Sequence, residues 1–192
     1  MAILGLLIAA SVWAGDSKDG LDAYSSTDYE TALAIWQPLA EDGDADSQYG
    51  LGMMYGNGFG VMMDDALAIK WYGLAADQGH AGAQYNLAVM YQNGWGVAPD
   101  EEQAVVFYAK AAEQGFAEAM SALGRHYAMD FSEDYDPVQA YKWYSLAAML
   151  DHIDANAKRD SIAEKMSAEQ VADSDALVES WSTSHSELFA KQ

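Results

Sequence analysis

Large apolar and small residues recur along the chain with a period of 36 residues, and the sequence matches itself three times without a gap. The small residues occupy four columns: Ala32, Ala68, Ala104 and Ala140; Ala40, Ala76, Ala112 and Ala148; Gly43, Gly79 and Gly115; and Ala45, Ala81 and Ala117. The large residues occupy four more: Ile35, Trp71, Phe107 and Trp143; Trp36, Tyr72, Tyr108 and Tyr144; Leu51, Leu87 and Leu123; and Tyr55, Tyr91 and Tyr127. A fixed period of this length is typical of a solenoid, whose units bury their apolar faces against their neighbours.

Within one period, the polar and apolar positions have the pattern of two helices. Leu67 and Trp71 belong to a helical stripe over 66–78, and a second stripe follows over 81–92. Gly79 separates the two stripes, at a place where a left-handed residue commonly ends a helix. We therefore expect an all-α solenoid of helix–turn–helix hairpins.

Asp64, Asp100 and Asp136 close the three complete units, and Asp100 and Asp136 can each cap the helix that follows. Asp100 is followed three residues later by Gln103 and Asp136 by Gln139, the spacing of a capping box, and Thr27 with Glu30 predicts the start of the first helix.

The repeats are expected over 27–151, and a C-terminal region follows over 152–192. The units are 29–64, 65–100, 101–136 and a partial fourth at 137–151. The C-terminal region is expected to hold a degenerate repeat helix, then a capping helix from Ala168 to about Trp181, opened by Ser167 with Gln170, and a frayed tail.

The N-terminus has the pattern of a secretory signal. Residues 2–14 carry no charge, and the run is shorter than the roughly 20 residues that span a bilayer. We expect a signal peptide over 1–14, cleaved after Ala14, a flexible lead-in over 15–26, and a periplasmic or secreted protein. No basic residue precedes the apolar run, so the alternative is an apolar helix that stays on the protein.

Composition excludes several classes of site and partner. The chain has 9 basic and 30 acidic residues and a formal net charge of −21, which disfavours nucleic acid and anionic membranes as partners. It has no cysteine, so it has neither a disulfide nor a thiolate site, and no pair of its four histidines has the spacing of a helical zinc site. We expect no cofactor and no metal.

The repeat columns resemble the Sel-one-like repeat (SLR) family, a relative of the tetratricopeptide repeats. The segments that carry the resemblance are AQYNLAVMYQNGWGVAPD and ALAIKWYGLAADQG, with MSAEQVADSDALVESW at the C-terminal end. The resemblance covers roughly Thr27 to Trp181 and implies a non-catalytic scaffold or adaptor that binds a protein or peptide on its concave face. Exported bacterial members imply work in the cell envelope or toward a host. Two departures concern local geometry: 129–135 lacks the G-x-G-V turn, and the first unit has Ile35 and Pro38.

The candidate binding site is a variable stripe on the first helices, at offsets of three and four residues that share one helical face. In the related tetratricopeptide repeats this face lines the concave groove. The stripe comprises Leu67, Lys70, Leu74, Gln103, Val106, Lys110, Gln139, Lys142 and Leu146. Its three lysines predict an acidic segment or a C-terminal carboxylate as the ligand. The alternative is that the lysines only solubilise the helices and cover apolar surface with their stems.

Two other features are candidate ligand sites. The loop carrying Asp130, Glu133, Asp134 and Asp136 is acidic enough for a hard cation but lacks the glycine of an EF-hand. The turns around Phe59 and Trp95 recur with the repeat, so we interpret them as structural, with a glycan-binding ridge as the alternative function.

We expect no enzymatic activity. Some SLR relatives are described as binding or hydrolysing β-lactams, but the chain lacks Ser-x-x-Lys, Ser-Asp-Asn and Lys-Thr-Gly. Ser184 and His185 lie in the expected frayed tail, where a fixed catalytic triad is not expected. The sequence thus predicts a monomeric protein-binding scaffold.

Overall fold

The computed structural model describes residues 15–129 and 133–190 of the chain, and within these ranges it consists of eleven α-helices without a strand. The all-α prediction is confirmed. The helices are α1 (Ser17–Ser25), α2 (Tyr29–Glu41), α3 (Ala45–Asn57), α4 (Asp65–Asp77), α5 (Ala81–Asn93), α6 (Glu101–Ala112), α7 (Ala117–Tyr127), α8 (Pro137–Met149), α9 (Ala155–Ala163), α10 (Ala168–Ser184) and α11 (Ser186–Phe189).

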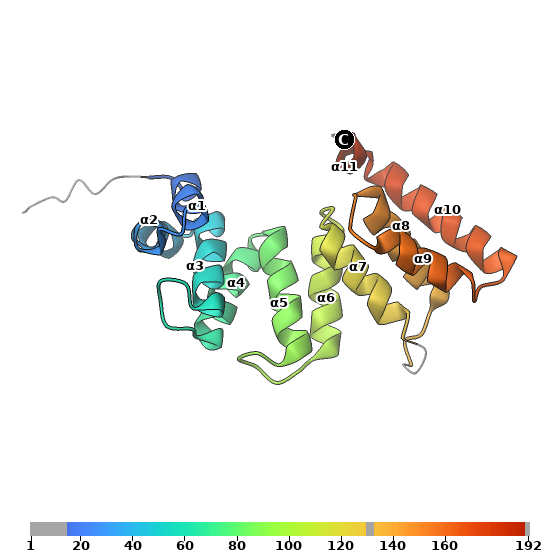
Figure 1. Ribbon diagram of the computed structural model, residues 1–192, viewed down its shortest axis with the longest axis horizontal. Helices are drawn as coiled ribbons and strands as arrows, with labels where there is room; N and C mark the ends of the chain where they lie inside the picture. The colour runs from blue at the N-terminus through green and yellow to red at the C-terminus, as the bar shows by residue number, and fades with distance from the viewer. Residues whose placement is uncertain (1–14, 130–132, 191–192) are drawn as a thin grey trace, which may run out of the picture.

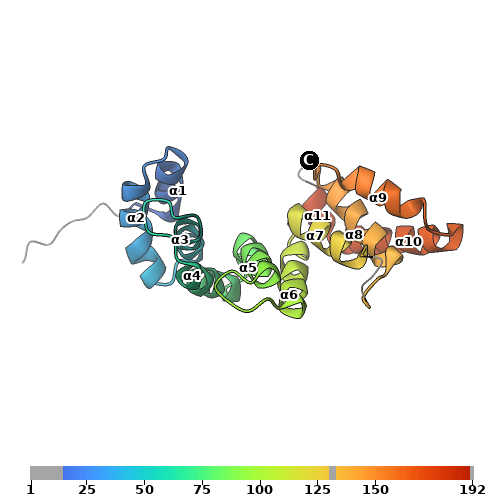
Figure 2. The same cartoon turned by 60° about the horizontal axis from the view of Figure 1, so that its bottom comes forward.

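Helices α2 to α9 form four successive hairpins that stack into a curved array (Figure 1). Each second helix packs most extensively against the first helix of the next unit: α3 against α4, α5 against α6 and α7 against α8. The same arc is visible from the second direction (Figure 2). The solenoid architecture predicted from the 36-residue period is therefore confirmed.

The repeating columns are the core of this array. Ala32, Ala68, Ala104 and Ala140 are fully buried, and Trp36, Tyr72, Tyr108 and Tyr144 have exposed fractions between 1% and 4%. The aromatic rings lie against second-helix positions that have no room for a side chain. A methyl group on Gly50 would lie 2.5 Å from the Trp36 ring, and one on Gly52 would lie 2.4 Å from the Tyr72 ring. The small residues therefore set the spacing between helices.

Aspartate side chains cap the first helix of each later hairpin. The side chains of Asp64, Asp100 and Asp136 accept hydrogen bonds from the first-turn amides of α4, α6 and α8. The first unit differs from the prediction, because Asp28 rather than Thr27 caps α2 and Thr27 has a φ of 64°. Pro38 lies inside α2 without ending it.

The predicted flexible lead-in over 15–26 is wrong in its described part, since it forms helix α1. Asp16 and Asp19 make a reciprocal capping box at its start. Trp36 Nε1 donates a hydrogen bond to Ser17 O at 2.9 Å, and the indole packs on Gly20. Residues 17–21 of α1 lie 36 residues before 53–57, the last part of α3, so α1 takes the place of a second helix ahead of the first unit. The predicted signal peptide over 1–14 lies outside the described residues.

The C-terminal region departs from the prediction in its tail. The predicted capping helix forms as α10, opened by the Ser167–Gln170 capping box, and packs against α8. Figures 1 and 2 show α10 alongside α8 at this end of the array. The tail expected to fray forms the short helix α11, whose Phe189 contacts the Trp181 ring edge-on.

The fourth unit keeps the repeat register in its second helix. Ala155 of α9 lies 36 residues after Ala119 of α7, and both are fully buried. Across residues 15–129 and 133–190, no helix is both long and apolar enough to cross a membrane.

Candidate functional site

The predicted stripe forms an exposed face on α4 and α6, which we call the first-helix face. Leu74 and Val106 are large apolar side chains that are 41% and 46% exposed. Lys70, Gln103 and Lys110 are exposed beside them, and Leu67 is partly buried at the edge of the core. Six of the nine predicted residues thus lie on this part of the stripe.

Each lysine of the stripe lies over an aromatic ring of its own helix. The Nζ atoms of Lys70, Lys110 and Lys142 lie 4.7, 4.8 and 4.1 Å from the ring centroids of Trp71, Phe107 and Trp143. Such cation–π contacts contribute about 0.5–1 kcal/mol at exposed sites. The lysines therefore cover the aromatic rings while their charge remains at the surface. Covering apolar surface and binding an acidic ligand are thus compatible roles for these residues.

On α8 the corresponding face is covered by the chain's own C-terminal helices. Leu146 is fully buried, so its prediction as a partner-contacting residue is wrong. The Ser174 hydroxyl of α10 donates to Val138 O at 3.2 Å, and Trp181 packs edge-on against Trp143 with centroids 6.3 Å apart. The repeat position of Leu146 is that of the exposed Leu74, so α10 removes this last part of the stripe from solvent.

The two remaining α8 residues of the stripe are also partly covered. Gln139 and Lys142 are half-buried, and burial lowers the pKa of the Lys142 ammonium, an effect that the nearby Glu113 carboxylate partly offsets. A partner therefore has full access to the stripe only on α4 and α6.

Glu113, at the end of α6, anchors the C-terminal helices. Its carboxylate accepts a hydrogen bond from Trp181 Nε1 at 3.2 Å and lies 3.0 Å from His185 Nε2. The His185 and Trp181 rings are stacked, with centroids 4.0 Å apart. A methyl group on Gly115 would lie 3.0 Å from Leu188, so α11 closely approaches the turn of the third unit. The cap thus joins the third and fourth units.

Ser184, His185 and Glu113 come together in a way that the sequence analysis did not expect. Ser184 Oγ lies 2.9 Å from His185 Nδ1, whose Nε2 faces Glu113. However, the Ser184 hydroxyl donates to Trp181 O at 2.8 Å, and Nδ1 lies 3.0 Å from the same carbonyl. None of the three cavities described below is lined by these residues. The arrangement acts as a hydrogen-bonded clamp, because the Ser184 hydroxyl is already engaged by the Trp181 carbonyl.

The opposite, second-helix face contains a row of repeat-related gaps, which we call slots. Each lies between successive second helices, with one member of the buried aromatic column as its floor. Slot 1 lies between α1 and α3 over Trp36, and slot 2 lies between α3 and α5 over Tyr72. Slot 3 lies between α5 and α7 over Tyr108, and slot 4 lies between α7 and α9 over Tyr144. Slots 1, 2 and 4 are cavities of about 360, 210 and 330 Å³.

The slots differ in which side chains of the protein occupy them. Slot 3 is filled by Gln92, whose Oε1 accepts hydrogen bonds from Tyr108 OH at 3.1 Å and Arg125 Nη2 at 3.0 Å. In slot 4, Lys158 Nζ lies 5.8 Å from the Tyr144 centroid. The row of slots was not predicted from the sequence. Its signal is a repeat position where the residue type changes from unit to unit, namely Gly56, Gln92 and Ala128.

The chain matches a known protein family over most of its repeats. A family model described as "Sel1 repeat" matches residues 45–80, 81–116 and 117–152, which is more than half of the chain. The chain belongs to the Sel1 repeat family. Sel1 repeat proteins generally serve as scaffolds for protein–protein interaction. No protein with a curated description matches the chain.

Two solved Sel1-type structures are similar to this Sel1 repeat chain. A Sel1 repeat protein from Oxalobacter formigenes is 32% identical with a TM-score of 0.69, covering 75% of this chain and 59% of that one. A protective antigen present in uropathogenic Escherichia coli strains, with an SLR fold, is 26% identical with a TM-score of 0.57, covering 92% of this chain and 48% of that one. The chain thus spans only about half of the length of these proteins.

The matched Sel1 repeats have the predicted period but a different phase. Each begins at a second helix, so that α3 with α4, α5 with α6 and α7 with α8 form the three matched repeats. These are the helix pairs with the most extensive packing, whereas the predicted units of 29–64, 65–100 and 101–136 begin at first helices.

The acidic loop of the third Sel1 repeat is only partly described, and Asp130 lies outside the described residues. Asp136 caps α8, and Asp134 Oδ2 lies 3.7 Å from His126 Nε2. Glu101 Oε1 lies 3.0 Å from the other nitrogen of that ring. Among the described residues, no group of three or more histidine, aspartate or glutamate side chains has the arrangement of a metal site.

The two glycine-rich turns that connect units place their aromatic residues differently. Phe59 is stacked on Tyr29, with centroids 5.1 Å apart and an interplanar angle of 9°. Trp95 is 50% exposed and forms one wall of slot 2. Both rings are exposed, Phe59 at 39%, but their neighbours differ.

Proposed function

We propose that this Sel1 repeat chain is a non-catalytic scaffold that binds a segment of a partner protein on the first-helix face of α4 and α6. The family's general role in protein–protein interaction supports the class of function. The exposed pair Leu74 and Val106, flanked by Lys70 and Lys110, supports the place. Apolar patches rimmed by polar side chains commonly mark protein-interaction sites.

The observation that carries this proposal is the packing of α10 on α8. The chain covers the fourth copy of the stripe with a helix of its own, and this packing buries Leu146 and uses Trp143 as an aromatic contact. Lys110 of α6 and Leu74 of α4 occupy the repeat position of Leu146. Phe107 and Trp71 occupy the repeat position of Trp143. The same face on α4 and α6 therefore presents related chemistry with no helix of the described chain packed on it, and a partner helix or extended segment would fit there.

The two exposed lysines of this face favour a partner segment that carries acidic residues. Lys70 and Lys110 are the basic residues of α4 and α6. Attraction between exposed charges is screened by salt, so binding through them would weaken as ionic strength rises. Replacing both lysines by glutamate should weaken capture of an acidic partner most strongly at low salt.

We also propose that the protein is exported and acts in the bacterial cell envelope or beyond it. The uncharged run over 2–14 and the small residues Val12 and Ala14 support cleavage after Ala14. N-terminal sequencing of the protein from a periplasmic or culture fraction should begin at Gly15. Recovery of a chain that still begins at Met1 would contradict export by a cleaved signal.

The binding proposal is tested by capture of partners from envelope extract with the parent and with Leu74→Glu/Val106→Glu. Buried charge at the centre of an apolar contact should abolish capture through this face. Met62→Glu and Ile153→Glu are matched controls, because both residues are strongly exposed and lie in loops outside the face, at 89% and 80% exposure. Both controls should capture as the parent does, whereas equal capture by all four proteins would place the partner elsewhere.

A further inference from the structure

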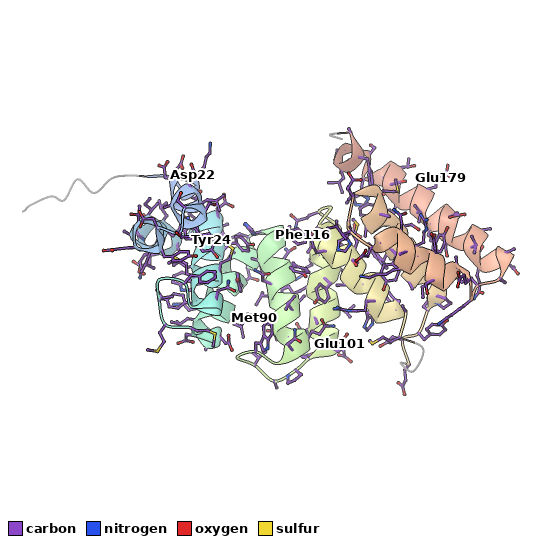
Figure 3. The ribbon with its side chains drawn as sticks, in the orientation of Figure 1. Asp22, Tyr24, Met90, Glu101, Phe116 and Glu179 are labelled. Carbon is purple, nitrogen blue, oxygen red and sulfur yellow. The ribbon has the colours of Figure 1, made fainter. Side chains whose placement is uncertain are left out.

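We propose that slot 2 is a receptor for an arginine side chain of a partner protein. This surface lies on the second helices and is distinct from the first-helix face, so the two proposals stand or fall separately. Met90, labelled in Figure 3, lies on α5 and lines the slot opposite Met53 and Gly56 of α3. Slot 3 is the repeat copy of slot 2, and the chain's own side chains fill it.

Slot 3 shows how the chain itself occupies such a gap. Arg125 extends from α7 to Gln92 of α5, with 3.0 Å between Nη2 and Oε1. The same amide oxygen accepts the Tyr108 hydroxyl at 3.1 Å. Tyr108 also interacts with Arg125, and burial raises the pKa of Tyr108 to about 12. A guanidinium, an amide and a phenol together fill the space between α5 and α7.

Slot 2 lacks both of the groups that fill slot 3. The position of Gln92 is Gly56, and the position of Arg125 is Val89, whose side chain is too short to cross the gap. The result is a cavity of about 210 Å³ above Tyr72. The missing groups are a guanidinium and its partner amide, so the internal copy identifies the chemistry that the cavity fits.

The walls of slot 2 suit the parts of an arginine side chain. Met53, Val89 and Met90 offer apolar surface for the methylene stem. Asp65 and the amide oxygen of Asn57 offer acceptors for the guanidinium, whereas the Asn86 side chain is hydrogen-bonded to Tyr49 and Tyr72. The indole of Trp95, half-exposed at the edge, offers a face on which a planar cation can stack.

Charge separates slot 2 from the other slots. Each of the other three slots contains a basic side chain of the protein itself. Lys18 lines slot 1, Arg125 reaches into slot 3, and Lys158 lies over Tyr144 in slot 4. The described residues that line slot 2 include Asp65 and no basic group. A chain with a net charge of −21 also attracts basic partners over longer distances. These observations favour an arginine over an acidic or neutral occupant.

The test uses the full chain and the blocked tripeptide acetyl-Gly-Arg-Gly-amide, with acetyl-Gly-citrulline-Gly-amide as the uncharged control of nearly the same shape. Titrations are followed by NMR through the indole N–H of Trp95. The arginine peptide should produce saturable shifts, and the citrulline peptide should bind at least about tenfold more weakly, since charge-assisted hydrogen bonds are about twice as strong as neutral ones. Equal affinities, or no saturable shift with the arginine peptide, would overturn the proposal.

Two variants place the peptide in the slot. Gly56→Gln/Val89→Arg copies the filling of slot 3 and should abolish binding. A methyl group on Gly56 would approach Ala68 and Tyr72 only to 3.5 and 3.8 Å, so there is room for a side chain. Asp65→Asn removes one charge without touching the Asp64 cap and should weaken binding about fivefold. Glu30→Gln, in the first turn of α2, is the matched control and should bind as the parent does. Unchanged binding by the double variant or by Asp65→Asn would overturn the assignment to slot 2.

Discussion

At the scale of single residues, the array is held in register by contacts between glycine or alanine and an aromatic ring. Gly50 lies under the Trp36 ring and Gly124 under the Tyr144 ring, where a methyl group would come within 2.5 and 2.7 Å. These distances are shorter than contact between carbon atoms, so a larger residue must displace the ring or separate the helices. Gly73 of α4 contrasts with both, because a methyl group there would meet nothing within 4 Å.

Gly50→Ala should therefore lower the free energy of unfolding by about 1–3 kcal/mol through overpacking against Trp36. Gly73→Ala is the matched change in the open interior of a helix, and it should raise stability by up to about 1 kcal/mol through helix propensity. Urea unfolding of both variants measures the difference. Equal effects of the two substitutions would mean that the Trp36 contact does not limit the spacing.

A second residue-scale effect concerns His80, the N-cap of α5. Its Nδ1 accepts a hydrogen bond from the Ala83 amide at 3.1 Å, its ring stacks on Tyr49, and its Nε2 lies 3.5 Å from Asp46. Burial lowers the pKa of His80 from 6.5, although Asp46 opposes the shift. The neutral, capping form is therefore favoured in the folded state. Its contribution to stability is present above the unfolded pKa of 6.5 and is lost as the pH falls below it.

The melting temperature of the parent should thus fall more between about pH 8 and about pH 5 than that of His80→Asn. Asparagine keeps a capping acceptor but does not titrate in this range. Differential scanning calorimetry at both pH values compares the two proteins. Parallel losses in parent and variant would show that the cap contributes no pH dependence.

At the scale of elements, Trp181 is a central anchor of α10 and α11. Trp181 is 8% exposed, contacts Trp143 and Phe189, and donates a hydrogen bond to Glu113. In a repeat array each element is stabilised chiefly by its neighbours, so loss of this anchor should act locally.

Trp181→Ala should increase amide hydrogen exchange in α10 and α11, as removal of a buried tryptophan costs about 3–5 kcal/mol. Exchange in α2 to α5 should stay unchanged. Leu177→Ala, on the same helix at a position that is 37% exposed, is the control and should have little effect. A uniform rise in exchange along the whole array would contradict the local anchoring of the cap.

The limits of prediction are also visible at the scale of elements. The hairpins were predictable because their columns repeat, but α1 was missed, since its sequence is polar and its burial depends on Trp36 19 residues away. Leu74 and Leu146 share one repeat position and one residue type, yet only Leu146 is buried. The difference comes from the packing of α10 on α8. This contact does not repeat along the chain, so the 36-residue period does not predict it. Slot 2 could be recognised only after the helices that form its two walls were placed together.

At the scale of the whole molecule, the Sel1 repeats present two different faces. The first-helix face has exposed apolar and basic side chains on α4 and α6, and the second-helix face has a row of slots over buried aromatic rings. The C-terminal helices end the open part of the first-helix face at α8. The account therefore predicts that partner contact is concentrated in the middle of the array.

The most direct test of this claim is site-specific photocrosslinking in cells that produce the protein, with a photoreactive amino acid placed at Val106 or at Ile153. Position 106 lies on the first-helix face, and Ile153 is an apolar position outside it that is more exposed than Val106. The account predicts a discrete crosslinked protein from position 106 that is absent from position 153 and is lost when Leu74→Glu is added. Crosslinks of equal yield at both positions, or a product from position 106 that survives Leu74→Glu, would contradict binding on the first-helix face.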